Sequence, residues 1–225
     1  MKTKNTMPVL LTVLVMVAML VIAGCSRDNE VELREAETAQ ARQELLPEGS
    51  QLKSSHADQN KILAEIRRAT AKYHNIDVAI ADGYELDPHC VAHPEFGGMG
   101  HHAIDTLKIL PAVVPSEPGI LVYEPMKNGK YRLVAVEFLV PAAPWDDDPD
   151  YDGPPMLGEV KFDDHREMIP VLDDFGEPVL DESGDTVKVN AKGGPPFPHY
   201  QLHVWVWKNN PEGMYSPFNP NVSCE

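Results

Sequence analysis

The sequence predicts an α+β domain in which an N-terminal helix packs on an antiparallel β-sheet or a partly closed β-barrel. Three observations lead to this fold class. Apolar residues recur at helical spacing between residues 62 and 73, and β-branched and aromatic residues dominate several short segments after Gly83. Pro and Gly are frequent between those segments, which is typical of turns. Residues 56–225 have the size of one compact domain, and no internal repeat is predicted in them.

The first element expected is a helix that starts near Ala57. Charged residues occupy its outer faces, so the helix would be amphipathic and would bury one side. Asn75 can cap a second short helix over residues 77–82, which Gly83 would end. The buried side of the first helix would consist of Ile62, Leu63, Ile66, Ala69, Thr70 and Tyr73.

Residues 119–125 and 131–141 predict the two strands of a β-hairpin, because the Asn128-Gly129 pair between them favours a tight turn. The second strand is apolar on both faces, as is typical of a strand at the centre of a sheet. Strict alternation places Leu133, Ala135 and Leu139 on the face of Glu137. The opposite face would then carry Val134, Val136, Phe138 and Val140.

Residues 198–207, PHYQLHVWVW, predict a further strand with two different faces. Alternation gives one ordinary core face, formed by Tyr200, Leu202, Val204 and Val206. The other face would carry two imidazoles and an amide beside two indoles, namely His199, Gln201, His203, Trp205 and Trp207. Such a row of polar groups on a buried strand predicts a binding site.

The N-terminus predicts export. Lys2 and Lys4 precede an apolar run of about 16 residues, and small residues then lead to Cys25. This pattern resembles a bacterial lipoprotein signal, which implies cleavage after residue 24 and acylation of Cys25. An uncleaved membrane anchor is the alternative, but the apolar run is shorter than the roughly 20 residues that span a bilayer. Ser26 after the cysteine favours the outer membrane of the bacterial envelope.

Residues 25–55 are expected to form the acylated N-terminus and a flexible tether. They contain no aromatic residue and few large apolar ones, so the segment cannot bury enough surface to fold alone. The lipid, rather than charge, would then hold the globular part to the membrane.

The net charge excludes one class of partner. The chain has 19 Lys and Arg against 35 Asp and Glu, a net charge of −16. Removal of residues 1–24, which hold two lysines and no acids, would leave −18. Such a surface repels nucleic acid and favours cations. Whether a small molecule or a protein is the partner stays open.

Two cysteines remain once Cys25 is acylated. In an oxidising compartment Cys90 and Cys224 allow a single disulfide, which would attach the C-terminus to the domain. A thiolate site for a soft metal is the alternative.

Three features together predict a divalent transition-metal site, for zinc, iron, manganese or copper. An ionised Glu137 on a central strand is costly unless it is paired. Two strand imidazoles, His199 and His203, and a glycine-rich turn with His101 and His102 could supply the remaining ligands. Neighbouring histidines on an extended strand point oppositely, so one of His101 and His102 would be a ligand. Gln201 could hydrogen-bond a bound water or orient an imidazole.

Other interpretations of these residues stay open. Glu137 could pair with Arg132, Lys161 or a histidine, and His199 could be an ordinary residue at the start of its strand. The protein would then be a non-catalytic envelope lipoprotein that binds a ligand or a partner and has a structural His/Glu cluster. If the site is catalytic, activation of water or of dioxygen by the metal is the expected chemistry.

A second motif matches the spacing of a calcium loop. In DPDYDGPPMLGE the candidate ligands are Asp148, Asp150, Asp152 and Glu159. Its three prolines restrict the backbone, and no helices are predicted on either side. A solvated acidic insertion is therefore the alternative.

Several motifs resemble those of a group of uncharacterised exported bacterial proteins. They are ADGY (81–84), GGMGHH (97–102), LVYEP (121–125), VEFLVP (136–141) and LHVWVWKNNPEGMYSPFNPNVSC (202–224). The resemblance implies a single extracytoplasmic domain and favours His102 over His101, but it carries no activity or ligand. The acidic stretch 146–152 departs from the pattern of the group.

Overall fold

The structure, a computed structural model, describes the backbone of residues 48–224 and the side chains of residues 55–224. The expected signal peptide (1–24), Cys25 and most of the expected tether lie outside the described residues. Residues 55–224 belong to one compact unit. In the described part of the chain, no helix is long and apolar enough to cross a membrane.

The N-terminal helical segment begins earlier than the apolar pattern predicts. Helix α3 spans Glu48–Thr70 and continues into the 3₁₀ turn η1 (Ala71–His74). Its first eight residues therefore belong to the segment that we expected to be a tether. Helix α4 (Ile76–Ala81) follows, and the Asn75 side chain accepts a hydrogen bond from the Asp77 N–H, so the predicted cap is confirmed.

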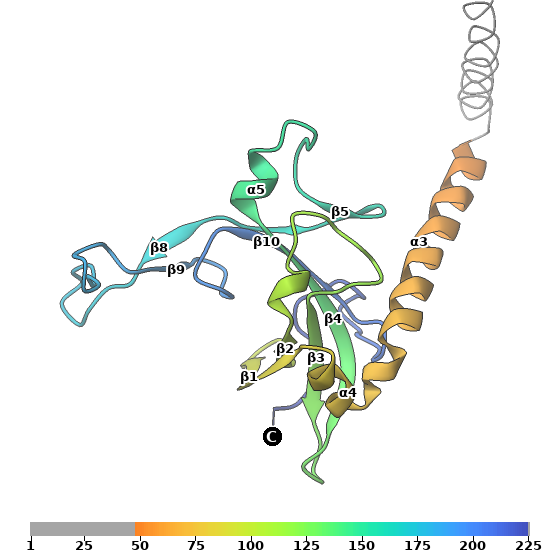
Figure 1. The fold of residues 1–225 in the computed structure, drawn as a ribbon, viewed down its shortest axis with the longest axis horizontal. Coiled ribbons are helices and arrows are strands. Elements are labelled where there is room, and N and C mark those ends of the chain that lie inside the picture. The colour runs from red at the N-terminus through yellow and green to blue at the C-terminus, as the bar shows by residue number, and fades with distance from the viewer. Residues whose placement is uncertain (1–47, 225) are drawn as a thin grey trace, which may run out of the picture. The chain divides into compact units, whose positions relative to one another are not determined.

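A six-stranded antiparallel sheet forms the body of the domain, in the order β1-β2-β3-β4-β10-β7 (Figure 1). Its strands are β1 (Glu85–His93), β2 (Gly97–Ile104), β3 (Ile120–Pro125), β4 (Tyr131–Pro141), β10 (His199–Val204) and β7 (Asp163–His165). The sheet is curled into a half-barrel, and β4 lies inside it, as predicted. The α+β fold class is thereby confirmed.

The remaining elements are short. They are η2 (Thr106–Lys108), α5 (Ala142–Asp146), and the small hairpins β5 (Met156–Leu157) with β6 (Val160–Lys161) and β8 (Met168–Pro170) with β9 (Lys188–Asn190). Residues 168–190, which we call the arm, extend away from β3 and β4 in Figure 1.

The sheet has a different apolar cluster on each face. The helix face packs against Leu63, Ile66 and Tyr73 of the helical segment. Its strand residues include Leu121, Tyr123, Leu133, Val136, Phe138, Tyr200 and Leu202. The opposite face, which we call the site face, consists of Ile120, Val122, Val134, Ala135, Leu139, Trp205 and Val222. Burial on both faces explains why β4 is apolar throughout.

Strict alternation fails in the first half of β4, which corrects the predicted faces. Val122 pairs with Ala135 and Tyr123 with Leu133, so Val134 is an extra residue in a β-bulge. Leu133 consequently lies on the helix face, and Val134 joins Ala135 on the site face. The carbonyl of Val134 accepts backbone hydrogen bonds from residues 207 and 208.

Of the two tryptophans after β10, Trp205 keeps the predicted face and Trp207 departs from it. The strand ends at Val204, and Trp205 packs in the site-face cluster. Trp207 instead packs against the helix-face cluster, and its indole Nε1 donates to the Thr70 hydroxyl at 3.1 Å. Trp205 is therefore a core residue, and Trp207 is half-buried against the helix-face cluster.

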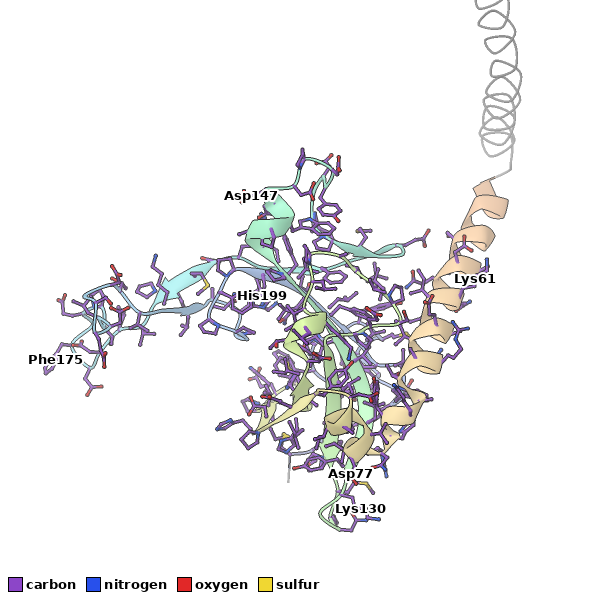
Figure 2. All side chains as sticks on the ribbon, in the orientation of Figure 1. Lys61, Asp77, Lys130, Asp147, Phe175 and His199 are labelled. Atoms are coloured by element: carbon purple, nitrogen blue, oxygen red, sulfur yellow. A yellow bond between two sulfur atoms is a disulfide. The ribbon has the colours of Figure 1, made fainter. Side chains whose placement is uncertain are left out.

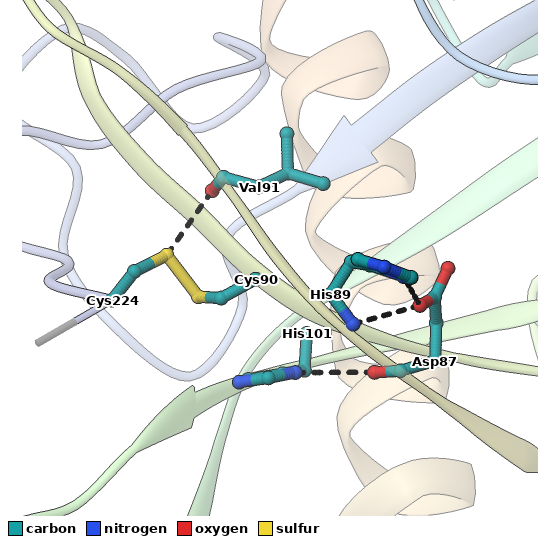
Figure 3. The surroundings of a disulfide bond; sticks show 6 residues. All are labelled: Asp87, His89, Cys90, Val91, His101 and Cys224. Carbon is teal, nitrogen blue, oxygen red and sulfur yellow. Dashed lines mark hydrogen bonds and ion pairs between the residues drawn. A yellow bond between two sulfur atoms is a disulfide. The ribbon is translucent and has the colours of Figure 1, made fainter.

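The predicted disulfide between Cys90 and Cys224 is present (Figure 3). It excludes a thiolate metal site at these cysteines. The segment before Cys224 lies against β2, because the Gly98 N–H donates to the carbonyls of Asn219 and Val222. A Cβ on Gly98 would stand 2.8 Å from the Val222 side chain, so glycine is needed for this close approach. The disulfide thus holds the C-terminal segment, whose Val222 packs in the site-face cluster, close to β1 and β2.

Candidate metal centre

Three side chains from three strands converge on the site face. One ligand atom each of His102, Glu137 and His203 lies within 4.8 Å of the other two. The Glu137 Oε2 is 3.4 Å from the Nε2 of His102 and 3.4 Å from the Nε2 of His203. The two imidazole rings are nearly perpendicular, at 82°. These are three of the predicted ligands.

The sheet register brings this group together. Glu137 of β4 is directly opposite His203 of β10 and, on its other side, opposite Ile120 of β3. His102 of β2 is opposite Val122, which is two residues from Ile120 along β3. His102 is therefore diagonal to Glu137 across β3. Side chains at paired positions project to the same face. Central strands with continuous hydrogen-bonded neighbours therefore fix the group, which makes it more rigid than a site built from loops.

Burial shifts the protonation of all three groups toward neutrality. The side chains of His102, Glu137 and His203 are 13%, 5% and 3% exposed. Desolvation raises the pKa of the Glu137 carboxyl to about 8. Desolvation likewise lowers the pKa of His102 to about 4 and that of His203 to about 3. Without a cation, the site therefore carries little charge at neutral pH.

The geometry fits a divalent metal ion. Two ligand atoms bonded to a tetrahedral ion at about 2.0–2.1 Å lie roughly 3.3 Å apart, close to both measured contacts of Glu137 Oε2. Among the described side chains, His203 Nε2 is the buried polar atom that has no hydrogen-bond partner. A buried nitrogen with no partner is costly, and coordination would satisfy it. Neutral imidazoles and a carboxylate are also the ligands that such ions prefer.

His101 is outside this group. Its Nδ1 donates to the Asp87 carbonyl at 3.1 Å (Figure 3), and its ring meets the edge of Tyr131 at 5.3 Å. Adjacent residues of β2 project to opposite faces, so His101 lies on the other side of the sheet from His102. The prediction that only one of the two histidines could be a ligand agrees with this arrangement.

His199 and Gln201 share a face with His203 but do not join the three converging ligands. The Nδ1 of His199 is 2.7 Å from the Phe197 carbonyl, and its Nε2 is 3.1 Å from Gln201 Oε1. Both ring nitrogens are therefore engaged, which rules His199 out as a ligand in this arrangement. Gln201 orients this imidazole, as was one of its two predicted roles.

His165 was missed by sequence reasoning. It pairs with His199 across the β10–β7 ladder, and the two rings stack at 5.1 Å. Its Nδ1 donates to the Gly193 carbonyl at 3.3 Å. The sequence gives little indication of His165, because the strand that carries it has only three residues and no apolar alternation. His165 extends the polar row on this side of the sheet beyond His199.

The other predicted partners lie elsewhere. Arg132 pairs with Glu124 at 3.9 Å, and the contacts of Glu137 are the two histidines. In the calcium-like stretch, Asp148 accepts from the Asp150 N–H. Across the described residues, His102, Glu137 and His203 are the group of acidic, histidine and cysteine side chains that converges. Asp148, Asp150, Asp152 and Glu159 do not.

Comparison of the chain with protein-family models, with curated proteins and with solved structures finds no match. The candidate centre is therefore argued from its own geometry and chemistry. The resemblance to exported bacterial proteins stays a prediction from the motifs.

Proposed function

We propose that this protein is an exported bacterial lipoprotein, anchored through Cys25, whose domain binds a divalent transition metal at His102, Glu137 and His203. The observation that carries the metal proposal is the buried Nε2 of His203, which among the described side chains has no hydrogen-bond partner and lies 3.4 Å from the Glu137 carboxylate. The disulfide supports export, since such bonds persist in oxidising compartments. The signal-like N-terminus supports anchoring by lipid.

Three protein ligands leave room for a fourth group. Catalytic zinc sites keep one position open beside three ligands, and iron sites with two histidines and one carboxylate keep several. His102 is the most exposed of the three side chains here, so a small ligand would approach from its side. In the catalytic form of the proposal, the metal would supply a Lewis acid that activates water or, if it is redox-active as iron, manganese and copper are, an electron donor to dioxygen. The strands hold the ligands in place, and the apolar site-face cluster limits water.

A second candidate function is a non-catalytic binding module with a structural His/Glu cluster. The specific observation in its favour is the pKa of Glu137, which burial raises to about 8. A protonated Glu137 between two neutral imidazoles can share a proton with either nitrogen, because both contacts measure 3.4 Å. No cation would then be needed to satisfy the carboxyl group.

Metal content distinguishes the two candidates. The full chain, purified in detergent without chelator, is analysed by inductively coupled plasma mass spectrometry beside Glu137→Gln and His203→Asn. We expect near-stoichiometric zinc, iron, manganese or copper in the native chain and less than a tenth of it in either variant. His101→Gln is the matched control, because that histidine faces the other side of the sheet. A folded native chain that holds no metal and takes up none when it is added would reject the metal proposal.

A further inference from the structure

The arm, residues 168–190, displays apolar side chains instead of burying them. Phe175 is 90% exposed, and Figure 2 shows it at the far end of the arm. Leu172 and Leu180 are 53% and 58% exposed. Large apolar groups on so small an element bring no stability to the fold. Large exposed apolar side chains gathered on one short segment, here within residues 172–180, are typical of interaction surfaces.

Backbone hydrogen bonds hold the arm in one conformation through a short repeat. Residues 171–178 (VLDDFGEP) and 179–186 (VLDESGDT) match each other, which corrects the prediction that the domain has no internal repeat. Val171, Val179 and Val187 are joined in a closed ring, since the N–H of each donates to the carbonyl of another at 2.8–2.9 Å. The arm is therefore a built element and not a loose loop.

Each repeat ends in the same capped turn. The Asp173 carboxylate accepts from the N–H groups of Phe175 and Glu177. In the second repeat Asp181 does the same for Ser183 and Asp185. Such side-chain caps fix the turn before any partner binds. Phe175 is consequently presented on a preorganised turn, which lowers the entropy that binding has to offset.

The negative charge of the arm limits which kinds of surface it can bind. Residues 168–190 hold six acidic residues and one lysine. Asp174, Glu177, Glu182 and Asp185 are exposed, and among the described residues none of them forms an ion pair. Unpaired carboxylates around an apolar tip complement a basic rim around an apolar pocket.

We propose that the arm docks into a partner protein whose surface has an apolar pocket for Phe175 surrounded by lysine and arginine residues. A second copy of this chain is disfavoured, because its net charge of −16 would repel the arm. An anionic membrane surface is disfavoured for the same reason. This proposal is independent of the metal centre, which lies on the site face of the sheet.

The first test uses site-specific photo-cross-linking in cells of the source organism. A benzoylphenylalanine replaces Phe175 in the full chain, and the control chain carries it at Leu107, which is 84% exposed on η2. We expect a discrete adduct with one other protein from position 175 only. No adduct, an adduct of two copies of this chain, a lipid adduct, or equal adducts from both positions would overturn the proposal.

Charge reversal then tests the basic rim. Asp174→Lys with Glu182→Lys should reduce the adduct about tenfold or more, because opposite charges steer this kind of association. Asp150→Lys with Asp152→Lys changes the net charge equally at two exposed positions of another loop and should leave the adduct unchanged. An equal loss in both double variants would show a general charge effect and contradict docking by the arm.

The repeat supplies a matched variant for the apolar anchor. Ser183 occupies the position of Phe175 in the second turn, so Phe175→Ser gives a side chain that this turn already accommodates. Binding of the purified cross-linked partner to Phe175→Ser should weaken about 30-fold, as for a central anchor residue. Ser183→Ala should bind like the native chain. An unchanged affinity of Phe175→Ser would reject the assigned anchor.

Discussion

The site face of the sheet buries ionisable side chains, whereas the arm exposes apolar ones. Glu137 and His203 lie almost fully inside the domain, and Phe175 projects almost fully into solvent. Each placement is unfavourable in isolation, because buried polar groups need partners and exposed apolar groups order water. Both groups stand on backbone that hydrogen bonds hold in place. The comparison shows that an energetically unfavourable placement can indicate binding in both regions. Buried ionisable groups indicate a cation inside the domain, and exposed apolar groups indicate a protein partner outside it.

The largest effect expected is that of the metal on the stability of the site face. At a free metal concentration 1,000 times the dissociation constant, binding adds about 4 kcal/mol to the free energy of unfolding. For a domain of this size, that corresponds to roughly 8–16 °C in melting temperature. We expect a strong chelator to lower the melting temperature by about this amount, as measured by calorimetry, and added metal to restore it.

The same measurement on variants separates the two regions. His203→Asn should melt at the same temperature with and without chelator, since it cannot complete the site. Phe175→Ser should retain the full chelator effect, because the arm does not contribute to the centre. Recovery with calcium alone would contradict a transition-metal site and would favour the acidic loop at residues 148–159.

The next largest effect is that of the disulfide that attaches the C-terminal segment to β1. The bond closes a loop with a sequence separation of 134, and loss of such a bond costs about 2–5 kcal/mol. Cys90→Ala with Cys224→Ala should therefore lower the free energy of unfolding in urea by about 3 kcal/mol. Hydrogen exchange should accelerate at Gly98, whose N–H is bonded to the C-terminal segment, and not at Val171 of the arm. Equal acceleration in both regions would mean that the bond stabilises the whole chain without a local effect.

The sequence alone predicted the three converging residues because their signal is simple. A carboxylate on a strand that is apolar on both faces needs a partner, and alternation placed His203 on a polar face whatever the exact register. The glycine-rich segment that we predicted to be a turn supplied His102, although the structure shows it as strand β2. The register that makes Glu137 and His203 direct neighbours cannot be predicted from either segment alone, because it depends on both strands and on the chain that connects them.

Other features could not be read locally. The bulge at Val134 moves Leu133 to the helix face, and no residue type in that stretch signals it. Trp207 follows the end of β10 and contacts Thr70, which is distant in sequence. His165 lies in a strand of three residues, too short for any periodicity. The repeat in the arm is present in the sequence, but it is short, and the different residues at positions 175 and 183 make it hard to recognise.

The pH dependence of stability is expected to be intermediate in size and to come from the site face. In the metal-free protein, His102 and His203 have pKa values of about 4 and 3, against 6.5 when unfolded. The unfolded chain therefore binds more protons as pH falls below 6.5, and stability drops. Glu137 has a pKa of about 8, against 4.5 when unfolded, so its contribution is lost as pH rises from 4.5 to 8.

These opposing contributions should give the metal-free protein a stability maximum near pH 6.5. Between pH 4.5 and 6.5 the two histidines outweigh the carboxyl, and above 6.5 the carboxyl outweighs the histidines, which in the unfolded chain still bind some protons. The free energy of unfolding should then fall by about 1 kcal/mol between pH 6.5 and 8. Urea titrations at several pH values measure this, and Glu137→Gln should abolish the fall. Bound metal should abolish it as well, because it holds the carboxylate ionised.

The smallest effect expected is that of the arm on stability, and it sharpens the contrast with the site face. Phe175 makes no buried contact, and its turn is held by Asp173, so Phe175→Ser should change the free energy of unfolding by less than about 0.5 kcal/mol. Urea unfolding of this variant beside the native chain provides the measurement. A loss of 2 kcal/mol or more would mean that Phe175 packs against the domain, and it would withdraw the argument that this side chain is reserved for a partner. A variant that is equally stable but binds the purified partner about 30-fold more weakly would instead show that Phe175 acts in binding and not in folding.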